Sequence, residues 1–337
     1  MTASAGTHEL RARLRGLGLS DAAIKAAWPN WWTEEAEESL SARVDLRFAI
    51  ARHLGLEPRS LLDDPEGPRF RWHDQARFKH LSHEGGIERA AITSFGRAVG
   101  SVILEATPPP RVGHRFPARQ LRQSILDAGS PFVRLIDLLA LSWSLGVPVI
   151  HLRVFPWPQK RMAAMAVQVG ERAAILLAKD SRYPAPVAFY LAHELGHIML
   201  DHLLAESAII DLDATALEDQ DGDKEEVLAD RFALELLTGN PQLTVLPAGR
   251  VANARELARV AVAASGEVRI EPGTLALCLA YSTGRWRTAN GAMAHIYPSA
   301  KPVWREINGA ARDQLLLAEL PTDARDYLEA VMGARSK

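Results

Sequence analysis

Two histidines four residues apart, with a glutamate between them, are the residues with the clearest chemical potential. His193, Glu194 and His197 lie in a mostly apolar run over 186–200, broken only by Gly196, and this pattern predicts a buried helix. Residues four apart share a helix face, with Cβ atoms about 5–6 Å apart, so both imidazoles can bind one zinc ion. Glu194 is rotated off that axis and can act on a water at the metal. Burying these three ionisable groups with neither metal nor partners would be costly, which favours a metal site.

The third ligand is expected on a later helix. Glu226 opens an amphipathic pattern over 226–237, and Asp230 stands four residues later on the same face. Glu226 would bind the metal, while Asp230 would accept the outer N–H of His193 and fix the tautomer of that ring. Glu225 is the alternative ligand at the start of the same helix.

His202 is a further alternative ligand because it lies five residues after His197. Its spacing differs from the metzincin pattern, in which the third histidine follows a helix-breaking glycine. Leu200 and Leu203 predict that the helix continues, which would point His202 elsewhere. The sequence therefore favours Glu226 as the third ligand.

The expected chemistry is hydrolysis of a peptide bond by a zinc-bound water. Zinc lowers the pKa of that water toward ~7 and polarises the carbonyl, while Glu194 takes the proton and delivers it to the leaving amine. Mn²⁺ or another divalent ion is the alternative metal. A strand expected over 173–178 is either an edge for an extended substrate or a core strand. The candidates for oxyanion or substrate contacts are polar side chains near the motif: Tyr183, Tyr190, His202 and Arg231.

The predicted helix with His193 and His197 and the predicted helix with Glu226 together resemble the ImmA/IrrE family of metallo-endopeptidases. The residues that carry the resemblance are HELGHIML at 193–200 and E-x-x-A-D-x-F-A-x-x-L-L at 226–237, preceded by a helix and three strands, and the likeness covers roughly 131–241. It implies a gluzincin-like HExxH peptidase with one zinc ion on His193, His197 and Glu226. Members often have a histidine directly after the leucine pair of the motif helix, where Asp201 stands here. A long acidic insertion between the helices is a second departure.

The family resemblance also implies a partner. Members typically cut helix-turn-helix transcriptional repressors and thereby switch on prophage, mobile-element, stress or defence genes. Some carry a helix-turn-helix module in the same chain. The implied partner is therefore a protein substrate, namely such a repressor.

Residues 1–66 are predicted to form a small helical domain. Its end, over 48–62, resembles the closing helices of Xre/Cro-type helix-turn-helix domains. Acidic side chains nevertheless fall where a recognition helix would be sought, and they would repel phosphates. DNA binding and protein docking both stay open for this segment. The acidic residues are Glu34, Glu35, Glu37 and Glu38.

Three further segments are expected after this one. They are a linker and helical segment over 67–115, the zinc metallopeptidase domain over 116–240 and a C-terminal helical domain over 241–337. The second segment opens with alternating basic and aromatic residues over 69–79, which suit either a nucleic-acid or acidic-peptide surface or a solvated face.

The fold class expected is α+β, a mainly helical chain with a zincin-like peptidase core. That core would contain a small, mostly antiparallel three-stranded sheet. The patterns predict strands over 147–155, 165–169 and 173–178, and the last two form a hairpin at Gly170. Besides the helices of the motif, they predict helices over 34–54, 84–105, 131–145, 252–264, 272–285 and 313–332.

Composition limits the compartment and the partners. The 337 residues carry a net charge of −2 and are 47% hydrophobic, which is typical of globular proteins and argues against wholesale polyanion binding. A single cysteine, Cys278, excludes an intramolecular disulfide and fits a reducing compartment. No apolar run approaches the ~18 residues of a membrane span, and the first residues do not match a secretion signal. We therefore expect a cytoplasmic protein without membrane contacts.

Two other functions fit parts of the sequence. A DNA-binding transcriptional regulator, with the peptidase-like domain as sensor or scaffold, would bind DNA with a steep salt dependence and would not cleave protein. An inactive zinc-binding adaptor fits Glu194 less well, because a structural zinc site has a closed coordination shell and needs no base.

Overall fold

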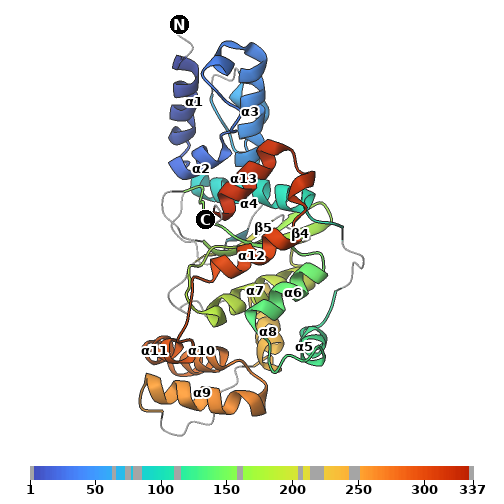
Figure 1. Cartoon of the computed structure of the whole chain (residues 1–337), viewed down its shortest axis with the longest axis vertical. Coiled ribbons are helices and arrows are strands. Elements are labelled where there is room, and N and C mark those ends of the chain that lie inside the picture. The colour runs from blue at the N-terminus through green and yellow to red at the C-terminus, as the bar shows by residue number, and fades with distance from the viewer. Residues whose placement is uncertain are drawn as a thin grey trace.

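The computed structural model describes residues 4–62, 66–72, 77–78, 86–109, 115–157, 162–203, 208–212, 224–242 and 251–333. The expected α+β class is confirmed, with helices in the majority around a small mixed sheet (Figure 1). The elements in chain order are α1 (Ser4–Gly16), α2 (Asp21–Ala27), η1 (Glu35–Glu38), α3 (Leu40–Leu54), η2 (Pro58–Leu61), β1 (Arg77–Phe78), α4 (Gly86–Glu105), α5 (Ala118–Asp127), α6 (Leu135–Ser144), β2 (Val149–His151), β3 (Met162–Val169), β4 (Arg172–Leu177), α7 (Pro184–Met199), β5 (Ala208–Leu212), α8 (Lys224–Thr238), α9 (Ala254–Val268), α10 (Pro272–Thr283), α11 (Trp286–Ile296), α12 (Trp304–Gln314), η3 (Leu317–Glu319) and α13 (Thr322–Met332).

The sheet has the strand order β1-β5-β3-β4-β2. β3 and β4 form the expected hairpin, with Val169 opposite Arg172 and Gly170 at a φ of 62° in the turn. β3 is also antiparallel to β5, whereas β1 and β2 run parallel to β5 and β4 respectively. The sheet is therefore mixed and wider than the mostly antiparallel three-stranded sheet expected, because β5 and β1 extend it beyond β3. β4 lies between β3 and β2, which fits the core strand of the two expected alternatives.

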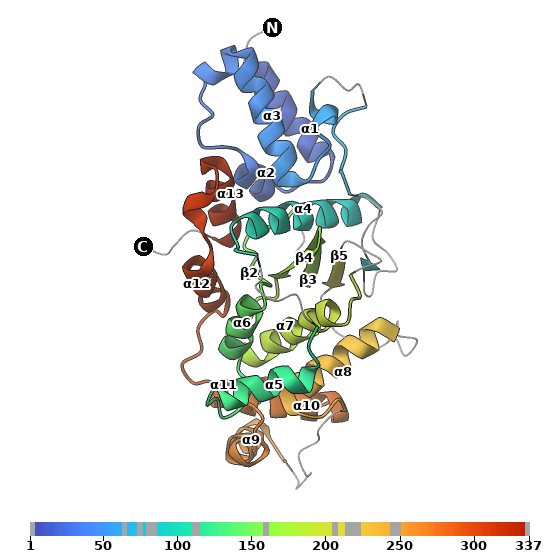
Figure 2. The ribbon, with the colours of Figure 1, turned by 90° about the vertical axis from the view of Figure 1, so that its right-hand side faces the viewer.

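Alternating side chains on β3 define the two layers that cover the sheet. Met165 and Val167 belong to the hydrophobic cluster on the α4 side, whereas Ala164 and Ala166 belong to the cluster around α7. This follows from the two-residue period of a strand. Figure 2 shows α4 over one face of the sheet and α7 under the other. The alanines present little bulk to α7, so the helix predicted to hold the metal ligands can lie close to the sheet.

The N-terminal helices share a hydrophobic core with α4 and α13. The helix expected over 34–54 is divided, because Ser39 accepts a hydrogen bond from the Ala42 N–H and so caps α3. The preceding acidic residues form η1, in which Glu37 is buried and accepts hydrogen bonds from the Thr7 backbone and hydroxyl. This glutamate is therefore part of the packing between α1 and η1 rather than of a solvated acidic face.

The C-terminal helices divide into two groups. α9, α10 and α11 pack around their own hydrophobic cluster, with buried Cys278 on α10. Burial raises the pKa of that thiol to about 11, as suits an inert core cysteine. α12 and α13 instead return to the sheet, where Asn308 bonds both backbone groups of His151 on β2. The single helix predicted over 313–332 is wrong, because Pro321 precedes the first turn of α13 and separates it from α12.

Each helix in the described part of the chain is too short or too polar to cross a membrane. The segment boundaries expected at 66, 115 and 240 stay predictions.

Gly55 gives a test of how closely α3 approaches α4. It ends α3 with a φ of 68°, and a Cβ there would lie 2.3 Å from the Ser94 carbonyl oxygen. Gly284 has nearly the same φ, 69°, but open space around it. We expect Gly284→Ala to lower the free energy of unfolding by about 1 kcal/mol and Gly55→Ala by ~3 kcal/mol, measured by denaturant titration. Equal losses would mean that the contact with Ser94 is not tight.

Candidate metal centre

The helix α7 carries both histidines into the interior. It begins at Pro184, which suits a first helical turn, and its apolar side chains bury it against the sheet. His193 and His197 are one turn apart and each only 1% exposed. Their Nε2 atoms are 3.0 Å from each other, and the two rings are nearly perpendicular, at 76°. The helical spacing has therefore brought both Nε2 atoms to one place.

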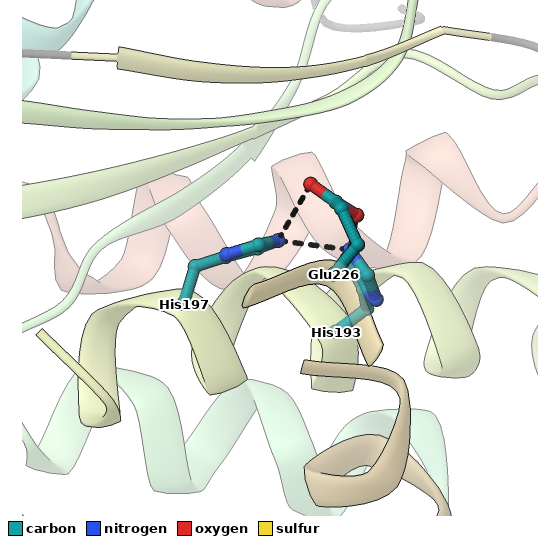
Figure 3. Close-up of side chains that lie close together, drawn as sticks. All are labelled: His193, His197 and Glu226. Carbon is teal, nitrogen blue, oxygen red and sulfur yellow. Dashed lines mark hydrogen bonds and ion pairs between the residues drawn. The ribbon is translucent and has the colours of Figure 1, made fainter. Parts of the chain in front are cut away.

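Glu226 reaches the same point from the first turn of α8. Its Oε2 lies 3.3 Å from His193 Nε2, and its Oε1 lies 3.5 Å from His197 Nε2. The three side chains converge in Figure 3, where the carboxylate stands across from both rings. All three residues are buried, and one ligand atom from each lies within 4.8 Å of the others.

The donor chemistry of this group fits a divalent cation. Two imidazole nitrogens and one carboxylate oxygen make up the His₂Glu set that binds zinc with a fourth position left for water or substrate. The carboxylate also offsets part of the cation charge in a buried place, where an uncompensated charge is costly. The His193, His197 and Glu226 group can therefore hold a metal ion, as the sequence predicted.

Gly196 permits α8 to approach α7 closely enough for this convergence. A Cβ at this position would lie 3.2 Å from the Ala229 carbonyl oxygen and 3.2 Å from the Phe232 Cβ, both on α8. Glycine within a helix costs about 1 kcal/mol relative to alanine. That cost is offset here by the packing of the helix that carries Glu226. The sequence showed Gly196 only as a break in an apolar run.

Replacing Gly196 by valine should separate the two helices and weaken metal binding without changing a ligand. We expect at least a ~10-fold loss in zinc affinity, because a small displacement of Glu226 spoils the geometry. Competition with a chromophoric chelator measures it. Gly309→Val is the matched control, since Gly309 lies within α12 with open space around it. Equal affinities in the two variants would show that the α7–α8 spacing does not set the site.

Asp230 lies where the sequence placed it, one helical turn after Glu226. Its Oδ1 is 2.8 Å from Nδ1 of His193, the nitrogen that faces away from Glu226. A carboxylate there accepts the Nδ1–H and leaves the Nε2 lone pair directed at the metal position. Asp230 is thus placed to hold the orientation of His193, and its role in fixing the tautomer stays a prediction.

His202 does not lie among the converging ligand atoms. Its Nδ1 is 2.9 Å from Nδ1 of His197, on the side of that ring away from Glu226. The prediction that the helix continues through Leu203 is wrong, because α7 ends at Met199 and Asp201 adopts a left-handed φ of 61°. The turn brings His202 back against His197 instead of carrying it outward.

Glu194 is fully buried on α7. Successive residues of a helix are turned by about 100°, so Glu194 leaves the helix in another direction than the flanking ligand His193. It can thus serve the site without taking a ligand position. Its assignment as a base stays a prediction.

The other predicted contacts are scattered around the site. Tyr183 precedes α7 and stacks on Tyr297 with ring centroids 5.9 Å apart. Tyr190 is half-buried on α7, its ring edge-on to Phe189, and Arg231 is exposed on α8. A role for them in stabilising an oxyanion stays a prediction.

Phe189 is a neighbour of the site that the sequence reasoning missed. Its ring lies 6.3 Å from that of His193 and 5.8 Å from that of Tyr281 on α10. The first contact could have been predicted, because Phe189 stands four residues before His193 on the same helix face. The second contact, with Tyr281, joins the site to the cluster of α9–α11. It could not have been predicted in this way.

Some sequence features lie outside the described residues. One is most of the acidic insertion, at residues 213–223. The other is part of the basic and aromatic stretch, namely Lys79 and the side chains of Arg77 and Phe78.

Replacing each of the two neighbouring glutamates of α8 by glutamine tests which of them is the third metal ligand. Glu226→Gln keeps the size of the side chain but removes its charge, so we expect at least a ~100-fold loss in zinc affinity by chelator competition. Glu225→Gln, on the same first turn of α8, should leave the affinity unchanged. The reverse pattern would make Glu225 the ligand.

Comparisons of this chain with protein-family models, with curated proteins and with solved structures found no match. The geometry of the metal centre is therefore the basis for a functional assignment.

Proposed function

We propose that the protein is a zinc-dependent endopeptidase that hydrolyses a peptide bond in a protein substrate. The observation that supports this most is the buried convergence of His193, His197 and Glu226, with Glu194 on the same helix as the two imidazoles. A His₂Glu set leaves a coordination position for a reactant, as in catalytic zinc sites, whereas structural sites close their shell with four protein ligands. A buried glutamate next to a ligand histidine in the chain is what a hydrolase needs and an adaptor does not.

The roles of the residues follow from this proposal. His193, His197 and Glu226 would hold one zinc ion, which supplies Lewis-acid chemistry by polarising a carbonyl and acidifying a water molecule. Glu194 would accept the proton of that water and pass it to the leaving amine. Asp230 would keep His193 in the ligating tautomer through the 2.8 Å contact to its Nδ1.

The substrate that we propose is a helix-turn-helix transcriptional repressor, as the resemblance to the ImmA/IrrE family implies. Its cleavage would derepress stress, prophage or defence genes. The N-terminal helices α1–α3 lie on the far side of α4 and the sheet from α7 (Figure 2). They could therefore bind a protein or DNA partner without covering the metal centre.

The test of this function is a substitution of Glu194 in the full chain. Glu194→Gln should retain zinc and the unfolding temperature but lower the cleavage rate by ~10²–10⁴-fold, the range for losing a general base. Cleavage of labelled casein, and of a purified Xre/Cro-type helix-turn-helix repressor, is followed by gel and mass spectrometry. Glu235→Gln, near the end of α8, is the control variant and should retain the wild-type rate.

A chelator experiment completes this test. Cleavage should stop on chelation and return when zinc is added. A Glu194→Gln protein that still cuts at the wild-type rate, after a contaminating protease is excluded, would refute the catalytic assignment. Zinc binding with no cleavage of either substrate by the wild type would instead favour a scaffold or sensor.

A further inference from the structure

The chain reverses direction directly after the metal-ligand helix. The Asp201 N–H donates to the Ile198 carbonyl at 3.3 Å, and the His202 N–H donates to the His197 carbonyl at 3.0 Å. These two bonds, with a left-handed residue between the helix and His202, form a Schellman turn. Asp201 takes that left-handed position with a φ of 61°, which glycine favours and aspartate tolerates better than most residues. Arg115 pairs with its carboxylate.

The turn sets two imidazoles side by side in the interior. Nδ1 of His202 lies 2.9 Å from Nδ1 of His197, and the residues are 8% and 1% exposed. Two such nitrogens can share only one proton, so one must donate and the other accept. The Nε2 of His197 faces Glu226 and His193, so it is the nitrogen that would bind a metal held by this group. With that metal bound, the Nδ1 of His197 would carry the proton.

We infer that His202 is a positioning residue that acts on the proposed metal through His197. Neutral His202, protonated on Nε2, accepts the Nδ1–H of His197 and so holds that ring in the ligating tautomer. This inference rests on the metal site of the proposed function and names a residue that the ligand set does not contain. It gives His197 the same kind of support that Asp230 gives His193, from a turn instead of a second helix.

The two supports differ in chemistry. Asp230 supplies a carboxylate oxygen 2.8 Å from His193, whereas His202 supplies an imidazole nitrogen 2.9 Å from His197. A carboxylate acceptor makes an imidazole a more basic ligand than an imidazole acceptor does. With a metal bound, His193 would therefore donate more strongly to it than His197.

Two substitutions at His202 separate its acceptor role from its bulk. Leucine fills similar space without an acceptor, and asparagine offers an amide oxygen close to where Nδ1 lies. In the full chain, we expect His202→Leu to weaken zinc binding by ~10–100-fold and His202→Asn to stay within ~3-fold of the wild type, by chelator competition. Unfolding of the zinc-free proteins checks that both variants fold. Equal affinity of His202→Leu and wild type, or failure of asparagine to restore it, would overturn the inference.

Asp201 provides a variant pair that changes neither ring. Asp201→Gly keeps the left-handed turn and should retain zinc affinity, whereas Asp201→Val opposes the turn and should weaken zinc binding as His202→Leu does. Zinc affinity that is unchanged in the valine variant would contradict the inference.

The tautomer of His202 can be observed directly. In the zinc-loaded protein with ¹⁵N-labelled histidine, the ring nitrogen shifts should show His202 protonated on Nε2 and His197 protonated on Nδ1. A His202 ring protonated on Nδ1 would overturn the inference while leaving the metal site intact. A wild-type protein that binds no zinc would refute the proposed function as well, so the two failures are distinguishable.

Discussion

The contact between α7 and α8 is the constraint on which the candidate metal centre depends. Two imidazoles and a carboxylate lose their hydration here, and this is tolerable only if the groups satisfy one another or a cation. Because the ligands come from two helices, the spacing of those helices determines the spacing of the ligands. The bare Cα of Gly196 on one side of α7 and the alanines of β3 on the other leave the helix little freedom to shift.

The orientation of each imidazole is determined outside the ligand set. A ligand imidazole can rotate about its metal bond, and before the metal binds it can take the other tautomer, unless its second nitrogen is held. For His193 the holding group comes from α8, the same helix that contributes Glu226. For His197 it comes from the turn that ends α7, so this support stays attached to the ligand's own helix. A change in the α7–α8 spacing would therefore disturb the two rings unequally.

Local patterns predicted the parts of the site that are close in sequence. The apolar run around His193 and His197 indicated a buried helix, and the spacing of Glu226 and Asp230 placed both on one face. Long-range pairing was not predictable in this way. β5 joins the sheet by pairing with β3, and β1 joins it by pairing with β5. Each of these pairings depends on a strand that is distant in the sequence. The turn after α7 escaped prediction because aspartate, not glycine, is its left-handed residue. The place of His202 depends on that turn.

The return of α12 to the sheet and of α13 to the N-terminal helices has a consequence for how the protein is made. Tyr327 stacks on His53 with centroids 4.3 Å apart and donates its hydroxyl hydrogen to the His53 carbonyl. Asn308 likewise completes the hydrogen bonding of β2. On the ribosome, the first sixty or so residues emerge long before these partners, so their core stays open to solvent until synthesis of the last helices. The nascent chain therefore exposes apolar surface that a chaperone would need to cover, and its N-terminal helices become fully packed only once α13 has been released.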